Sequence, residues 1–212
     1  MTQDCRPDWY PDWAGQTIVV VASGPSAAAV PLASARGQAR FIAVKTSLDL
    51  CPWAEALYAC DYLWWDQNAG VPEFSGLKVT INRRASEAWN LRLLRCGIGT
   101  SAMEFGELGR VAWGGNSGFN AVNFAAQLAP AKILLVGFDM TLARGVRWHR
   151  DHPGGLTPGP HIVDRWRRCL DAAAPALVAC GIRVLNCSPD SALEGYEKME
   201  FEAALRAPSL YP

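Results

Sequence analysis

The sequence has no excess of charge of either sign and no long apolar run. Its 20 basic and 20 acidic residues cancel over 212 positions, so it shows neither the basic surplus of a nucleic-acid binder nor an acidic tail. No run approaches the roughly 18 apolar residues that span a membrane, and the polar N-terminus lacks the apolar stretch of a signal peptide. We therefore expect a cytoplasmic protein with no membrane span.

Paired cysteines are also missing. The seven cysteines are odd in number, lie mostly inside apolar runs and include no CxxC pair. Such spacing is typical of reduced thiols that fill a core, and it argues against a disulfide framework. Half of the residues are apolar, so a chain of this length can bury a core as one domain.

Short β-branched runs alternate with longer alanine-rich segments, which is typical of βαβ units. This rhythm predicts an α/β protein: a single Rossmann-like domain over 17–212, with a mostly parallel sheet and helices on both faces, preceded by an N-terminal extension, 1–16. The predicted strands are 18–22, 40–44, 57–60, 77–81, 133–136 and 182–185, and the predicted helices are 27–35, 119–128 and 162–180. A binding site is expected at the carboxyl ends of the strands.

Two glycine-containing turns are candidates for phosphate binding, because each is predicted to open a helix. The first is Ser23-Gly24-Pro25-Ser26, directly after the first strand, and the second ends in Asn116-Ser117-Gly118. The first turn is not the G-x-G-x-x-G fingerprint and has neither the lysine of a P-loop nor an acidic ribose clamp at the usual place, which disfavours NAD and simple P-loop chemistry. A structural turn and an ordinary N-cap remain the alternatives.

The only histidines, His149, His152 and His161, lie in or beside a segment with four glycines and three prolines, 141–160, which we interpret as a lid-like loop. Imidazole suits general acid or base chemistry at neutral pH. His149 and His152 could also ligate a metal, but no HExxH helix or cysteine partner supports this, so no protein metal site is predicted.

Carboxylates just beyond predicted strands form a further group of candidates. They are Asp61, Asp66 and Asp139. Each could hold Mg²⁺, bind a ribose hydroxyl or cap the next element. For Asp139 we favour a functional role.

The order of these motifs resembles a known family. Gly-Pro-Ser after a strand, Ala-Val-Lys-Thr, Asn-Ser-Gly opening a helix, Leu-Leu-Val-Gly-Phe-Asp and the closing Asn-Cys-Ser-Pro-Asp-Ser-Ala-Leu are similar to motifs of bacterial lipooligosaccharide sialyltransferases. They also resemble the related 6-hydroxymethylpterin pyrophosphokinase-like proteins and a group of phage and prophage proteins. The resemblance covers about 17–195.

The resemblance implies a role for each matching residue. Gly24, Pro25 and Ser26, with Asn116, Ser117 and Gly118, would grip the nucleotide of a sugar donor, and His161 would act as general base. The chain departs from the family at Ser23 and Lys45, where the sialyltransferases have asparagines. Lys45, followed by Thr46, would suit a diphosphate and so shifts the expected donor towards a nucleoside diphosphate sugar or a nucleoside triphosphate. The family's tyrosine pair has no clear counterpart, and Arg144, Arg147, Trp148 and His149 are candidates to replace it.

We therefore expect a glycosyltransferase that moves a sugar from a nucleotide donor to an acceptor hydroxyl, with His161, His149 and Asp139 as catalytic candidates. The acceptor could be a glycan or, in the phage setting that the resemblance implies, a modified nucleobase in a bacterial cytoplasm. One alternative is Mg²⁺-dependent phosphoryl or pyrophosphoryl transfer, with Asp61, Asp66 and Asp139 on the metal and Lys45 on the phosphates. Another is a nucleotide-binding phage protein without catalysis. The oligomeric state stays open, as does whether Trp9, Tyr10 and Trp13 dock on this domain or on a second subunit.

Overall fold

The centre of the molecule is an all-parallel sheet of eight strands, in the order β10-β9-β8-β1-β2-β3-β4-β5. The computed structural model describes residues 6–97, 99, 102–149 and 157–210. The strands are β1 (Thr17–Val21), β2 (Arg40–Val44), β3 (Ala56–Tyr58), β4 (Leu77–Thr80), β5 (Arg92–Leu93), β6 (Arg95–Gly97), β7 (Arg110–Ala112), β8 (Lys132–Val136), β9 (Arg183–Asn186) and β10 (Glu197–Lys198). Strands β6 and β7 form a separate parallel pair. The predicted α/β fold of Rossmann-like type is confirmed.

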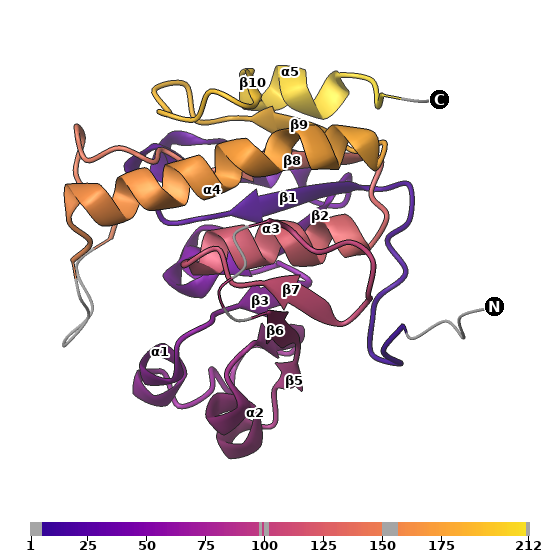
Figure 1. Cartoon of the computed structure of the whole chain (residues 1–212), viewed down its shortest axis with the longest axis vertical. Coiled ribbons are helices and arrows are strands. Elements are labelled where there is room, and N and C mark those ends of the chain that lie inside the picture. Colours follow the sequence, from indigo (N-terminus) through magenta and orange to yellow (C-terminus); the bar gives the residue numbers. More distant parts are fainter. Residues whose placement is uncertain (1–5, 98, 100–101, 150–156, 211–212) are drawn as a thin grey trace.

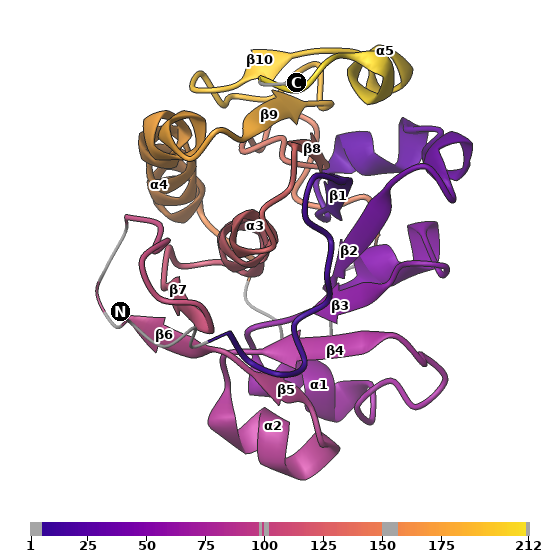
Figure 2. The same cartoon turned by 90° about the vertical axis from the view of Figure 1, so that its right-hand side faces the viewer.

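Helices cover both faces of the sheet, as predicted. They are α1 (Tyr62–Gln67), α2 (Arg83–Trp89), α3 (Ser117–Gln127), α4 (Pro160–Ala179) and α5 (Phe201–Arg206), together with the 3₁₀ helices η1 (Pro25–Ala29), η2 (Leu32–Ala35) and η3 (Lys45–Leu50). Figures 1 and 2 show α3 and α4 on one side of the sheet and α5 on the other.

The two-residue period of the strands divides the core between these layers. Ile18 and Val20 of β1 belong to the cluster that contains the buried residues of α3 and α4. Val19 and Val21 point to the opposite cluster, which contains residues of η1, η2, α1 and α5. Because both faces are covered, the central strands are continuous apolar runs, which is why the sequence identified them.

The strand order places a switch point between β1 and β8. After β1 the chain proceeds outward through β2, β3, β4 and β5, and α3 then returns it to β8 on the other side of β1. The connections that leave β1 and β8 therefore diverge at the carboxyl edge. In open α/β sheets, ligands bind in the crevice that such divergence leaves.

One predicted helix is wrong. The segment 27–35 forms η1 and η2 instead of one α-helix. The cause is Pro31, since a proline disfavours the α conformation of the residue before it. Val30 accordingly has an extended backbone, with φ −82° and ψ 130°.

The N-terminal extension docks on its own domain. Tyr10 and Trp13 are buried in the cluster that also contains α3. The Tyr10 hydroxyl donates to Gln127 Oε1 at 2.7 Å, and the Gly15 N–H donates to the Ala129 carbonyl at 2.9 Å. This observation answers the question that the sequence left open for Tyr10 and Trp13.

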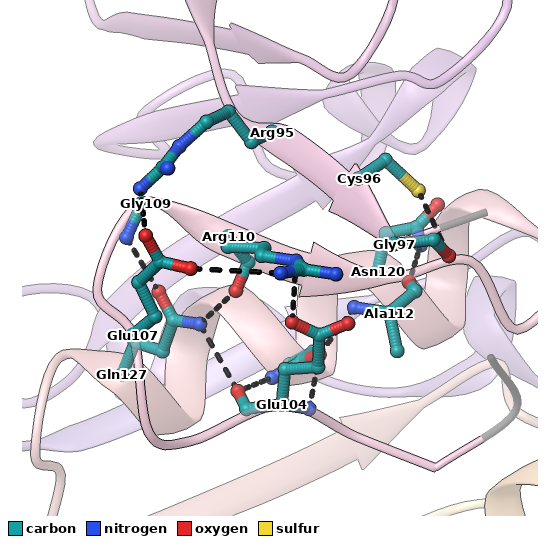
Figure 3. A network of polar contacts seen from close by, with 11 residues as sticks. Arg95, Cys96, Gly97, Glu104, Glu107, Gly109, Arg110, Ala112, Asn120 and Gln127 are labelled. Carbon is teal, nitrogen blue, oxygen red and sulfur yellow. Dashed lines mark hydrogen bonds and ion pairs between the residues drawn. The ribbon is translucent and has the colours of Figure 1, made fainter.

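Helix α3 carries a buried row of amide side chains that holds the segment before it (Figure 3). All of its residues are buried, so its polar side chains require partners. Asn123 Oδ1 accepts from the Ala112 N–H at 2.9 Å and from the Glu104 N–H at 3.1 Å. The Gln127 amide donates to the Glu104 and Arg110 carbonyls. These bonds fix the chain that leads into the second glycine turn.

The cysteines match the expected core-filling role only in part. The six cysteines of the described residues are all free, and they comprise three buried (Cys51, Cys169 and Cys187), two half-buried (Cys60 and Cys96) and one exposed residue (Cys180). In the part of the chain that the structure describes, no helix is both long enough and apolar enough to span a bilayer.

Candidate functional site

A cavity lies at the switch point, at the carboxyl ends of β1, β2 and β8. It is open on one side and contains about 830 Å³ of space, part of which is bulk solvent. Its lining comes from four places in the chain: Ala22, Ser23, Gly24; Val44, Lys45; Asn116, Ser117, Gly118; and 137–166, represented by Gly137, Asp139, Met140, Thr141, Leu142, Val146, Arg147, Pro158, Val163 and Trp166. The two glycine turns that the sequence singled out therefore meet in one cavity.

The first turn packs directly against the end of β8. The Gly24 N–H donates to the Gly137 carbonyl at 2.9 Å. A Cβ on Gly24 would overlap both that carbonyl and the carboxylate of Asp139. A Cβ on Gly137, whose φ is +71°, would likewise lie only 2.4 Å from the Ala22 carbonyl oxygen. Glycine is needed here because two backbone segments touch.

Asp139 occupies the position in which a phosphate was expected. Its carboxylate accepts from the Ser26 N–H at 3.2 Å and from the Ser26 hydroxyl at 2.8 Å. Burial raises the pKa of Asp139 above its ordinary value, and the hydrogen bonds from Ser26 oppose that shift. Ser26 and Pro25 do not line the cavity. The first predicted anion position is thus filled by the protein's own carboxylate.

The C-terminal Ser-Pro-Asp-Ser motif holds Asp139 in place. The Ser188 hydroxyl accepts from the Phe138 N–H at 3.0 Å, and the Ser191 hydroxyl donates to the Phe138 carbonyl at 2.6 Å. The Ala192 N–H donates to the Asp139 carbonyl at 2.8 Å. Sequence reasoning noted this motif through the resemblance alone and missed its positioning role, because contacts across some 50 residues leave no local signal.

The second turn opens a true α-helix. Asn116 is the N-cap of α3, and its Oδ1 accepts from the Phe119 N–H at 2.9 Å. The Ser117 hydroxyl accepts from the Cys60 N–H at 3.1 Å, and burial raises the pKa of the Cys60 thiol to about 12. The Asn116 Nδ2 has no hydrogen-bond partner among the described residues. Asn116, Ser117 and Gly118 all line the cavity, so the N-terminal end of α3, which carries the positive end of the helix dipole, borders it.

Lys45 brings a cation to the same cavity from the end of β2. Its backbone adopts the left-handed conformation, with φ 56°, which costs roughly 1–2 kcal/mol for a residue other than glycine. Its ammonium forms an ion pair with Asp61, whose side chain is half exposed. Thr46 and Asp61 lie outside the lining, and Thr46 accepts from the Trp64 indole at 3.4 Å.

Neither His149 nor His161 lines the cavity. His161 is exposed on the first turn of α4, although Pro158 and Val163 on either side of it are lining residues. The His149 ring packs edge-on against Trp148 at 5.1 Å. His152 lies outside the described residues. The predicted loop does reach the site, since the Trp148 N–H donates to the Ser23 carbonyl at 3.1 Å.

The described residues contain no group of three or more His, Cys, Asp or Glu side chains that could hold a metal ion. The three carboxylates proposed for Mg²⁺ are dispersed among separate partners. Asp139 binds Ser26, Asp61 pairs with Lys45, and Asp66 accepts from the Tyr62 hydroxyl at 2.9 Å.

The lining carries two cationic side chains and one carboxylate, and the ammonium of one of these cations, Lys45, is paired with Asp61 outside the lining. Its ionisable side chains are Lys45, Arg147 and Asp139, and the one carboxylate among them is already bound to Ser26. Trp166 is a lining residue that sequence reasoning missed. The signal was its spacing of three from Val163, which places both on one face of α4. The cavity can thus accept an anionic group beside apolar and aromatic surface.

Comparison with known protein families, with curated proteins and with solved structures finds no match to this chain. Function is therefore inferred from the geometry of the site.

Proposed function

We propose that the cavity binds the phosphate-bearing part of a nucleotide sugar, and that the protein transfers the sugar to an acceptor hydroxyl. One observation carries this proposal. The turns at Ser23-Gly24 and at Asn116-Ser117-Gly118 line a single cavity, together with Lys45 from the end of β2, which is next to β1 in the sheet. The resemblance to bacterial sialyltransferases, drawn from the same turns, supports a sugar donor.

The phosphate would lie on the α3 side of the cavity. The N-terminal amides of an 11-residue α-helix and Lys45 offer positive charge there. On the η1 side, the Ser26 N–H already donates a hydrogen bond to the carboxylate of Asp139. A second negative group beside that carboxylate would be repelled.

The proposed reaction is a direct displacement. The acceptor hydroxyl loses its proton to the His161 imidazole, and its oxygen forms a bond with the anomeric carbon of the donor. The bond between that carbon and the phosphate oxygen breaks, and the leaving nucleotide takes the electron pair. Lys45 and the α3 amides stabilise the charge that develops on the phosphate.

A second function is favoured by one observation. His161 is exposed and does not line the cavity, as expected if the protein binds a nucleotide without catalysis. The Mg²⁺-dependent alternative gains no such support, because Asp61, Asp66 and Asp139 bind separate partners.

Thermal unfolding with CMP, UDP, GDP, ADP and ATP, each with and without Mg²⁺, tests nucleotide binding. A true ligand at a hundredfold excess over its dissociation constant should add roughly 2.7 kcal/mol to the free energy of unfolding. Lys45→Met should weaken binding about 10- to 100-fold, because a hydrogen bond to a charged group contributes roughly 1.5–3 kcal/mol. Arg92→Met removes a cation from the distant edge strand β5 and should leave affinity unchanged.

Binding and catalysis are then separated with His161→Ala. If a nucleotide sugar is consumed by the wild type and not by the variant, while both bind the nucleotide equally, the base role is supported. Nucleotide binding without turnover by the wild type would favour the non-catalytic function. The proposal fails if no nucleotide stabilises the protein.

A further inference from the structure

An exposed tryptophan stands beside the cavity on a fixed piece of backbone. Trp113 follows β7 and is 42% exposed, one of few large apolar side chains that the described surface presents so openly. The Asn120 amide donates to the carbonyls of Ala112 at 2.6 Å and of Trp113 at 3.0 Å. Gly114 follows at φ +49°, where a Cβ would overlap Phe119. The indole is therefore presented to solvent from a rigid position.

Arg165 of α4 lies over this indole. Its guanidinium carbon is 5.0 Å from the centre of the Trp113 ring. Gly115 leaves room for it, since a Cβ there would lie 2.8 Å from Arg165 Nη2. The turn at Gly114-Gly115 thus leads into α3 and also leaves space for the contact between Arg165 and Trp113.

The guanidinium of Arg165 is not paired with any carboxylate in the portion of the chain that the structure covers. Its neighbours on the same helix differ, because Arg167 and Arg168 both pair with Asp164, at 2.9 Å and 3.2 Å. A guanidinium presents five N–H donors in a planar fork that fits a carboxylate. Arg165 therefore keeps donors available for a ligand.

Neither Trp113 nor Arg165 lines the cavity of the proposed donor site, but each has a lining residue close to it in sequence. Asn116 and Trp166, close to Trp113 and Arg165 in sequence, both line the cavity. His161 precedes Arg165 by four residues on α4, a spacing that makes the two side chains neighbours at roughly 5–6 Å between Cβ atoms. An acceptor held on the pair would be next to the proposed base.

We propose that Trp113 and Arg165 form an acceptor subsite for a pyranoside that carries a carboxylate. The apolar face of the sugar ring packs on the exposed indole surface, and the carboxylate accepts a bidentate hydrogen bond from Arg165. A neutral nucleobase would stack on the indole but offers the guanidinium no negative charge, so the acidic sugar fits both groups better. The assignment of this subsite to the acceptor rests on the proposed function, whereas the binding of an acidic sugar to it does not.

Binding is measured by NMR titration of the full chain, without nucleotide, using methyl β-D-glucuronoside, methyl β-D-glucoside and adenosine as probes. We expect millimolar binding of the glucuronoside. Trp113→Ala and Arg165→Met should each weaken it at least tenfold, and Trp113→Phe should restore most of the loss in Trp113→Ala. Arg168→Met, which removes an exposed arginine that is already paired, is the matched control and should change nothing.

The outcomes separate this inference from the proposed function. No glucuronoside binding to the wild type, equal loss in Arg168→Met, or tighter binding of adenosine than of the glucuronoside would each overturn the subsite. Retained folding of both variants is checked by their thermal unfolding. If the glucuronoside binds as expected and no nucleotide stabilises the protein, the subsite stands and the transferase proposal fails.

Discussion

The two glycine turns look alike in sequence and differ in what they do. The turn at Gly24 opens η1, a 3₁₀ helix of five residues, and the carboxylate of Asp139 occupies its Ser26 amide. The turn ending at Gly118 opens α3, an α-helix of 11 residues whose cap is Asn116. Only the second places the N-terminus of an α-helix in the cavity lining without a carboxylate of the described residues bound to it.

The difference follows from the needs of a buried acid. A carboxylate removed from water must receive hydrogen bonds, and Asp139 is 3% exposed. Ser26 supplies a backbone and a side-chain donor, so this turn serves the protein's own anion. Because a short 3₁₀ helix contains fewer aligned peptide dipoles than a longer α-helix, its total dipole is smaller. The N-terminus of α3 is therefore the better site for a bound anion.

The largest expected effect comes from disrupting the close packing of the turn at Gly24 against the end of β8. Gly24→Ala forces a Cβ onto the Gly137 carbonyl and the Asp139 carboxylate, and should cost about 3 kcal/mol in free energy of unfolding. Chemical denaturation measures it. Gly106→Ala is the control, because no atom lies within 4 Å of its added Cβ. Equal stability of the two variants would show that the turns on β1 and β8 are not in close contact.

A smaller effect should follow from removing the carboxylate that binds Ser26 in the turn at Gly24. Asp139→Ala leaves the Ser26 N–H and hydroxyl without an acceptor and should cost about 2 kcal/mol. It also creates a vacant anion position, so formate should raise the unfolding temperature of the variant and not that of the wild type. If formate fails to stabilise the variant, Ser26 is not an anion position.

The same pair of proteins gives a pH dependence. The folded-state pKa of Asp139 lies above its ordinary value of 3.8, so the native state holds this proton more tightly than the unfolded chain. The associated stabilisation is complete below pH 3.8 and is lost as the pH rises through the folded-state pKa. The stability of the wild type relative to Asp139→Ala should therefore fall as the pH is raised from 3.8. A constant difference would contradict the assigned direction.

The smallest effect concerns the open side of the cavity. Asp61→Asn removes the ion pair of Lys45, and because both side chains are partly exposed the free energy of unfolding should change by about 0.5 kcal/mol at most. Freed of its partner, Lys45 should bind a nucleotide about two- to threefold more tightly. Glu107→Gln, which breaks the surface pairs with Arg95 of β6 and Arg110 of β7, is the control for both measurements. Weaker nucleotide binding by Asp61→Asn would instead indicate that Asp61 itself contacts the nucleotide.

Sequence patterns located the central strands well and the edges poorly. The predicted strand 40–44 coincides with β2, and the predicted 133–136 differs from β8 by one residue. The short strands β5, β6, β7 and β10 were missed because two or three residues carry no periodic signal. The helices α1, α2 and α5, of six or seven residues, are below the length at which helical spacing is evident.

The sequence by itself determined the parallel α/β architecture, because apolar β-branched runs and helical spacing are properties of neighbouring residues. It also marked Ser23, Lys45 and Asp139 of the cavity lining, since each follows a predicted strand, and the turn at Asn116, since that turn opens a predicted helix. Only the tertiary structure decided which anion position Asp139 fills, which cation Asp61 holds and that Arg165 lies over Trp113. These pairings join residues that are 16 to 113 positions apart, and no local propensity specifies which of several possible partners a folded backbone brings within reach.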